Sequence, residues 1–273
     1  NPVSTFAQQL GLTANLQGAY QDRPTISYQP QTGSQFIRNL TTPINPGSVL
    51  YLLQSGYPAD LVFNLTVDSI NGIKNRSVAG GALRLADPEF IKIVQAIRKG
   101  QESGHVGIRM ERAKDKPDSV AFFFQDQEID PQLKAELAEV RRTLRLDPQA
   151  KSFPVVFGAN ASQPNEIAIL SRSIIRILSE LATFVEVPDD HVTSGIAPYL
   201  GPAGTNSQPL LRVFSSTCKP VNAFISVCYE EHWFWIDKTD TQSKRTIAYL
   251  LVLLALSDTG AKESLPVITI QAN

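Results

Sequence analysis

The sequence predicts an α+β fold in which a mostly antiparallel sheet packs against several amphipathic helices. Three observations support this prediction. Hydrophobic residues make up 42% of the 273 residues and charged residues 19%, which is enough apolar material for a sizeable core. Segments that alternate with the period of a strand occur among segments with helical spacing. The two kinds follow no strict strand–helix repeat, which favours the α+β class.

The first 33 residues are rich in Gln, Pro, Thr, Asn and Gly and carry few periodic apolar positions. They predict either an extended N-terminal arm or tether, or a loop that packs on the domain surface. Residues 34–273 are then expected to form a single α+β domain.

Short helices are expected between residues 34 and 73. Ser48 is expected to cap a helix that ends at Gly56. Pro58 suits the first turn of the next helix. Asn71-Gly72 then predicts a turn.

Three longer helices are expected in the middle of the chain. Asp87-Pro88 and Asp130-Pro131 each combine a capping Asp with a Pro that suits the first helical position, and Ser171 introduces the third helix. The apolar residues expected to face the core in the three helices are Phe90, Ile91, Ile93, Val94 and Ile97, then Leu133, Leu137, Val140 and Leu144, then Ile174, Ile175, Ile177, Leu178 and Leu181.

Strands are expected between these helices. His105–Glu111 alternates like a half-buried strand, whereas Val120–Phe124 is apolar on both faces and predicts a central strand. Phe153–Phe157 and Ile167–Ile169 are further candidates.

The C-terminal third predicts a β-hairpin, a helix and a last strand. The hairpin pairs Val221–Cys228 with Trp233–Asp237, and Gly260 is expected to end the helix over Ile247–Leu256. Leu265–Ile270 is the expected last strand. A long internal loop, rich in Pro, Gly, Asp, Ser and Thr, is expected over residues 188–209.

The charge balance and the apolar segments exclude two kinds of partner. Lys and Arg number 25 against 26 Asp and Glu, so the net charge of −1 gives no basic surface for nucleic acid. The longest apolar run, Ile247–Leu256, is much shorter than the roughly 20 residues that cross a bilayer, so we expect a buried core helix there.

The two cysteines are expected to be free or buried thiols. Cys218 and Cys228 stand at opposite ends of the expected strand. Eight extended residues span roughly 26 Å, whereas a disulfide needs Cα atoms within about 7 Å.

The sequence shows no nucleophile elbow, phosphate-binding loop or dinucleotide-binding glycine motif. His105, His191 and His232 are the only histidines, and none makes a metal pair at helical spacing. A site assembled from distant residues stays open. The expectation is a non-catalytic protein with no metal or cofactor.

Three groups of side chains have both a structural and a functional interpretation. His232 with the adjacent tryptophans is interpreted as a hairpin turn and a packed sheet face, although acid–base work is an alternative. Asp237, with Asp240 after it, is interpreted as helix capping, with an anion site as the alternative. Polar residues near buried helices are interpreted as locks on the main chain, with a ligand pocket as the alternative. The residues assigned to structural polar roles are Asn71, Asn75, Arg76, Arg172 and Asp237.

Several short phrases together resemble a family of poorly characterised outer-membrane lipoproteins of Gram-negative bacteria. The resemblance covers residues 28–270 approximately. It implies a lipidated cysteine just before residue 1 and implies no catalytic residues. The phrases are Asn39-Leu-Thr-Thr-Pro43, Ser55-Gly-Tyr-Pro58, Val67-Asp-Ser-Ile-Asn-Gly72, Asn75-Arg-Ser77, Ser171-Arg-Ser173, Val185-Glu-Val-Pro188, Trp233-Phe-Trp-Ile-Asp237 and Ser243-Lys-Arg-Thr246.

The resemblance and the missing motifs lead to one main expectation of function. The chain is expected to face the periplasm at the outer membrane, held there by its lipid, as a structural or interaction component of a cell-envelope assembly such as a secretion complex. Its expected partners are other envelope proteins. The alternative is a periplasmic protein that binds a small ligand or glycan through His191, Trp233 and Trp235 near the 188–209 loop. A hydrolase built around His191 or His232 is the third hypothesis.

Overall fold

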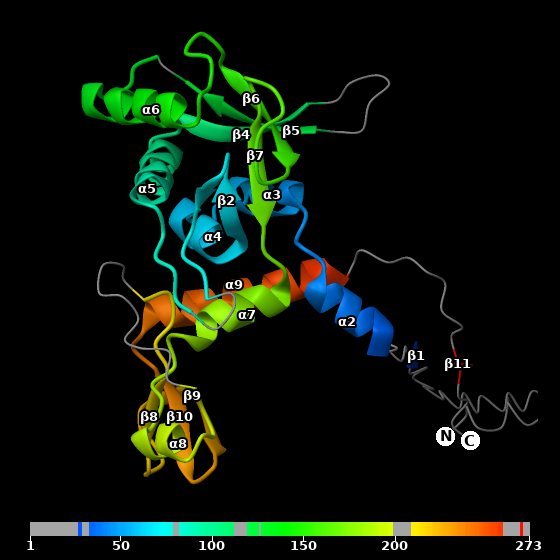
Figure 1. The fold of residues 1–273 in the computed structure, drawn as a ribbon, viewed down its shortest axis with the longest axis vertical. Helices are drawn as coiled ribbons and strands as arrows, with labels where there is room; N and C mark the ends of the chain where they lie inside the picture. The colour runs from blue at the N-terminus through cyan, green and yellow to red at the C-terminus, as the bar shows by residue number, and fades with distance from the viewer. Residues whose placement is uncertain are drawn as a thin grey trace, which may run out of the picture. The chain divides into compact units, whose positions relative to one another are not determined.

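The computed structural model describes residues 27–28, 33–78, 82–111, 119–125, 127–198, 209–258 and 268–269. The chain divides into two compact units. One contains Gly33–Ala261 and the other contains both ends of the chain. Helices, a mixed six-stranded sheet and an antiparallel three-stranded sheet confirm the predicted α+β class (Figure 1). The sheets are mostly, but not wholly, antiparallel.

In the unit of the two termini, strand β1 (Ser27–Tyr28) pairs antiparallel with β11 (Ile268–Thr269). The remainder of the expected arm and of the expected last strand lies outside the described residues. So do Gly260, expected to end the last helix, and residues 199–208 of the expected long loop.

The larger sheet has the strand order β3-β2-β7-β6-β5-β4. Neighbouring strands are antiparallel except β6 and β7, which are parallel. The predicted central strand, β5, lies between β6 and β4, as expected. The strands are β2 (Val67–Ile70), β3 (Ile73–Lys74), β4 (Val106–Glu111), β5 (Ser119–Phe124), β6 (Ser152–Phe157) and β7 (Ile167–Ser171).

Two strands of this sheet, β2 and β3, were not predicted from the sequence. β2 falls in the stretch where only short helices were expected. Its Val67 and Ile70 are buried, and it pairs with β3 on one side and β7 on the other. The turn predicted at Asn71-Gly72 is confirmed, and both residues have positive φ, 46° and 83°. Such angles suit a two-residue hairpin turn.

Two helices of the larger unit begin at a side chain that caps them, Asn45 for α3 and Asp130 for α6. Asp130 accepts hydrogen bonds from the amides of Gln132 and Leu133, as the sequence predicted. The cap predicted at Ser48 is wrong, because Asn45 caps that helix and Pro46 begins it. The helices are α2 (Gly33–Thr41), α3 (Pro46–Gln54), α4 (Ala59–Thr66), α5 (Pro88–Glu102), α6 (Pro131–Thr143), α7 (Ile174–Ala182), α8 (Asp189–Thr193) and α9 (Thr241–Asp258).

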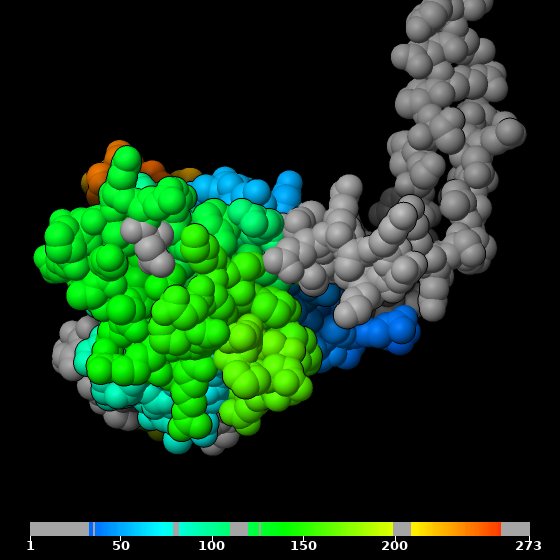
Figure 2. Space-filling view, turned by 90° about the horizontal axis from the view of Figure 1, so that it is seen from above, coloured from blue at the N-terminus to red at the C-terminus, as the bar shows by residue number. Residues whose placement is uncertain are grey.

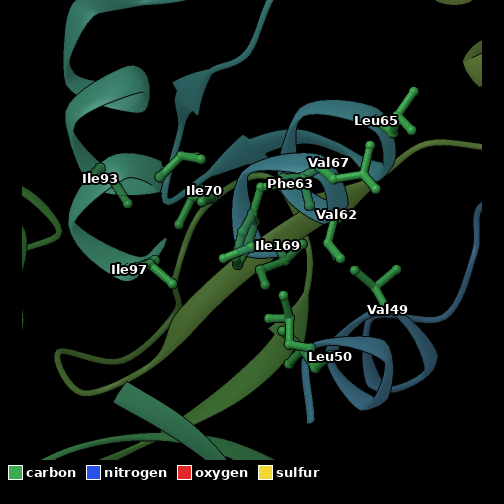
Figure 3. Packing of buried hydrophobic residues seen from close by; sticks show 14 of the residues in the cluster. Val49, Leu50, Val62, Phe63, Leu65, Val67, Ile70, Ile93, Ile97 and Ile169 are labelled. Atoms are coloured by element: carbon green, nitrogen blue, oxygen red, sulfur yellow. The ribbon is translucent and has the colours of Figure 1, made fainter. Parts of the chain in front are cut away.

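The core lies where α3, α4 and α5 pack on the larger sheet. Figure 3 shows Val49 and Leu50 of α3, Phe63 of α4 and Ile93 of α5 converging there. The rings of Phe63 and Phe122 stack with centroids 6.2 Å apart, which joins α4 to β5. In Figure 2 the surface facing the viewer is formed mainly by the green part of the chain, which includes β5, α6, β6 and β7.

The inward faces of two predicted helices need correction. Ile91 of α5, and Ile175 and Leu178 of α7, are exposed, although all three were expected to face the core. In α6 the four predicted apolar positions are all buried. An apolar residue at the margin of a helical face can remain on the surface, because a folded protein always exposes apolar area.

The smaller sheet has the order β8-β10-β9 and is antiparallel throughout. Its strands are β8 (Phe214–Ser216), which was not predicted, β9 (Ala223–Tyr229) and β10 (His232–Asp237). Ile236 of β10 joins the same buried cluster as Tyr249 of α9, whose ring lies 5.0 Å from that of Tyr57. Among the described residues, no helix combines the length and hydropathy needed to cross a membrane.

Candidate functional site

The smaller sheet brings two of the three histidines together. The hairpin between β9 and β10 turns at Glu230 and Glu231, which both have positive φ, 45° and 64°. This tight turn places His232 at the first position of β10, opposite Tyr229. The short helix α8 lies beside the same sheet (Figure 1). Its His191 packs against His232 with ring centroids 4.7 Å apart.

One main-chain carbonyl oxygen is hydrogen-bonded to both imidazole rings. The carbonyl of Glu230 lies 3.1 Å from Nε2 of His191 and 3.1 Å from Nδ1 of His232. A carbonyl oxygen only accepts hydrogen bonds, so each of these nitrogens carries its proton. In the neutral rings, Nδ1 of His191 and Nε2 of His232 therefore carry the lone pairs.

Asp190 completes this group. Its Oδ1 lies 3.6 Å from Nε2 of His232. One donor atom from each of Asp190, His191 and His232 lies within 4.8 Å of the other two. The histidine side chains are mostly shielded, whereas the Asp190 side chain is largely exposed. These three side chains, called here the His–Asp cluster, are of the types that bind transition metals.

The residues of the predicted ligand site do not share one face of the sheet, because side chains alternate between the two faces along β10. His232 and Phe234 point to one face of β10 and Trp233 and Trp235 to the other. His191 contacts the rings of His232 and Phe234. The structure therefore does not gather His191 with the two tryptophans on one face.

Each tryptophan has its own neighbour. The ring of Trp235 packs on Phe214 with centroids 5.0 Å apart, and its buried Nε1 has no hydrogen-bond partner among the residues that the structure describes. The ammonium of Lys219 lies 5.3 Å from the ring centroid of Trp233. Both tryptophans are half-buried.

Strand β9 is an open edge of the smaller sheet. It pairs with β10, and among the described residues no strand pairs with its other side. On the face that carries His232, three apolar side chains of β9 follow one another at every second position and stay exposed. They are Ile225 (43% exposed), Val227 (58%) and Tyr229 (57%), called here the β9 row.

A buried polar cluster joins α7 to the end of α4 and to β2. Arg172 donates to the carbonyls of Asn64 and Arg76, and Asn75 donates to that of Val67. Arg76 binds Glu180 at 3.3 Å and Thr183 at 2.6 Å. Burial lowers the pKa of both Arg76 and Arg172, while the charge of Glu180 opposes this shift.

The other two residues given structural roles lie elsewhere. Asn71 accepts from the amide of Ala168 and donates to the carbonyl of Leu144, so it links three segments of the chain. Asp237 accepts from the amide and hydroxyl of Thr239, and these bonds lower its pKa.

One apolar cavity of the larger unit contains few groups that could take part in catalysis. It measures about 220 Å³ and is lined by residues such as Leu53, Ile97 and Phe122. Its polar side chains are Gln54 and Gln101. The amide of Gln101 accepts from Ala59 and donates to the carbonyls of Leu53 and Tyr57. This cavity holds no pair of acid and base.

The ligand hypothesis from the sequence brought the two segments together, but it grouped His191 with Trp233 and Trp235 and did not pair His191 with His232. Only the tight turn at Glu230 and the packing of α8 bring them within reach. The thiols of Cys218 and Cys228 are free and exposed, which confirms that they form no disulfide.

The fold and the site together define an α+β domain with a small, open-edged sheet. No known protein family, curated protein or solved structure matches this chain. Its function is therefore inferred from its own side chains.

Proposed function

We propose that the protein is a non-catalytic component of a cell-envelope assembly that holds a partner protein along the edge strand β9. The observation that carries this proposal is the open edge with its β9 row. An edge strand presents main-chain amides and carbonyls that can pair with an extended segment of another chain. Exposed apolar side chains at every second position supply pockets and contact area for such a segment.

Other parts of the smaller sheet are consistent with a docking role. Long apolar edge strands expose a protein to aggregation unless they are covered. Cys228, a free thiol, lies within β9 on the face opposite the β9 row, and the acidic turn Glu230-Glu231 follows the strand. A partner strand would hydrogen-bond the main-chain amides and carbonyls at this edge and would bury the β9 row at the same time.

The proposal also includes the cellular location of the assembly. The resemblance to outer-membrane lipoproteins supports a lipid anchor at the outer membrane, with the domain on the periplasmic side. A secretion complex is one assembly of this kind.

The test uses charged substitutions on the β9 row. The full chain is expressed in a Gram-negative envelope, cross-linked with formaldehyde and recovered from membranes. Val227→Lys is compared with Leu251→Lys, a matched change at an exposed leucine of α9. The expected result is one cross-linked partner, retained by Leu251→Lys and reduced at least tenfold by Val227→Lys. A lone monomer, or equal recovery with both variants, would contradict the proposal.

The glycan-binding alternative depends on accessible tryptophan faces. Sugars stack on open aromatic rings, but Phe214 covers part of Trp235 and Lys219 lies against Trp233.

The hydrolase alternative depends on a base near a nucleophile. In the His–Asp cluster, two ring nitrogens already donate to Glu230, and no described serine, threonine or cysteine side chain is hydrogen-bonded to either imidazole. The docking proposal is therefore favoured over both alternatives.

A further inference from the structure

The His–Asp cluster has the donor set of a metal site. Two imidazole nitrogens and one carboxylate are the ligands of many zinc centres that keep a fourth position open. Such a set binds ions of the zinc type in preference to magnesium or calcium, which favour oxygen ligands. The cluster joins two segments of the chain, since α8 provides Asp190 and His191 and β10 provides His232.

The hydrogen bonds to Glu230 prepare both rings for coordination. A metal-binding histidine usually donates its other ring N–H to a carbonyl or carboxylate, which fixes the tautomer and the orientation of the ring. Here the Glu230 carbonyl takes both of these protons, at 3.1 Å each. The same carbonyl therefore leaves one lone pair on each histidine for a metal ion.

The surroundings keep the histidines in place and leave the carboxylate free to adjust. His191 is only 4% exposed and packs against the ring of Tyr229 as well as that of Phe234. The His232 side chain is 12% exposed, but that of Asp190 is 67% exposed. A metal ion could therefore reach the cluster from the side of Asp190.

The three donor atoms need to move only a short distance toward one another to bind one ion. Ligands about 2.0–2.1 Å from a tetrahedral zinc ion are roughly 3.3 Å from one another. The Asp190 oxygen and the His232 nitrogen are already 3.6 Å apart. One ring nitrogen of His191 lies within 4.8 Å of the other two donor atoms, so the group closes when the exposed Asp190 side chain rotates and the His191 ring shifts to present its Nδ1.

We propose that Asp190, His191 and His232 bind one divalent transition-metal ion of the zinc type, with a fourth position open to water or to a ligand from a partner. The ion would tie α8 to the hairpin that carries β9. This proposal does not depend on the docking function, because its ligands are Asp190, His191 and His232, none of which belongs to the β9 row.

The two exposed cysteines would bind zinc themselves, so the test starts from the tag-free full chain with Cys218→Ser and Cys228→Ser. Zn²⁺ is titrated by calorimetry, and Co²⁺ by visible absorption, which reports tetrahedral nitrogen and oxygen coordination. The ligand variants are Asp190→Asn, which keeps the shape of an exposed side chain, and His232→Gln. The matched control is His105→Gln, because His105 lies away from the cluster and bonds Ser103 and Gln127.

The expected result is one equivalent of Zn²⁺ bound, with affinity reduced at least tenfold by Asp190→Asn and by His232→Gln and unchanged by His105→Gln. Mg²⁺ at the same concentration is expected not to compete. The melting temperature is expected to rise with Zn²⁺ in the parent and control, but not in the ligand variants. Absence of binding, or binding that both ligand variants retain, would overturn the proposal. Circular dichroism of each variant without metal shows whether a loss of affinity comes from unfolding, and a variant that unfolds is replaced by His191→Gln.

Discussion

The guanidinium of Arg172 donates a 3.0 Å hydrogen bond to the main-chain carbonyl of Asn64, 108 residues earlier in the chain. The same group lies 3.4 Å from a carboxylate oxygen of Asp68 and donates to the carbonyl of Arg76. A carbonyl at the end of a helix has no partner within the helix. Arg172 therefore satisfies the end of α4 and joins it to the segment that leads into α7.

Replacing Arg172 with Leu is expected to be strongly destabilising. The change removes the side-chain donor to the carbonyl of Arg76 and one of the two side-chain donors to that of Asn64, and it leaves Asp68 and Glu180 with less positive charge beside them. We therefore expect a loss of about 3–5 kcal/mol in the free energy of unfolding. Urea denaturation measures it. Arg142→Leu is the control, since Arg142 is exposed and pairs only with the neighbouring Glu139 in the described contacts. Its expected cost is below about 0.5 kcal/mol. Equal costs for the two variants would disprove the structural role of Arg172.

Gly100 is expected to resist replacement by Ala, although Ala is the better helix former. The residue lies within α5, and a Cβ there would come 2.3 Å from Cγ2 of Val106. The close approach lets the chain turn from α5 directly into β4. We expect Gly100→Ala to cost about 1–3 kcal/mol despite its gain in helix propensity.

A double-mutant cycle separates this contact from propensity. In a Val106→Ala background the clashing methyl is gone, so the cost of Gly100→Ala is expected to fall by at least half. Additive costs would show that contact with Val106 is not the reason.

Asp240 is expected to stabilise α9 in a manner that depends on pH. Its carboxylate accepts from the amide of Ser243 at 3.0 Å and from the hydroxyl at 2.7 Å. Burial raises the pKa of Asp240, but the two bonds from Ser243, the charge of Arg212 and the bond from the Gln242 amide together outweigh burial, so the pKa is lowered. A lowered pKa in the folded state gives stability that is present above the ordinary pKa near 4 and is lost as the pH falls through the folded value.

The measurement compares Asp240→Ala with the parent chain at two pH values. At pH 7 the substitution is expected to cost about 1 kcal/mol of unfolding free energy, the usual value of a helix cap. The cost is expected to shrink as the pH is lowered to 2.5, because the parent carboxyl takes up a proton as the pH falls through its folded pKa. A cost that is the same at both pH values would contradict the role assigned to the carboxylate.

Local signals in the sequence predicted much of the fold. Asp130 and Asn71-Gly72 gave correct element boundaries because caps and tight turns depend on residues close in the chain. β2 and β8 were missed because short strands are decided by their partners, and the same is true of the parallel pairing of β6 with β7. The His–Asp cluster was missed for a similar reason. Its two segments meet only through the tight Glu230 turn, and no spacing in the sequence encodes that meeting.

Cross-linking from β9 itself tests the docking function most directly. Cys228 is an exposed native thiol on β9, on the face opposite the β9 row, so a benzophenone maleimide attached there leaves the row uncovered. The label is placed on the full chain with Cys218→Ser in envelope membranes and activated by light. The matched control carries Leu251→Cys in a chain without the other two cysteines.

We expect one partner adduct from Cys228 that disappears when Val227→Lys is added, and no such adduct from the α9 position. No adduct from Cys228, or the same adduct from both positions, would contradict docking at β9.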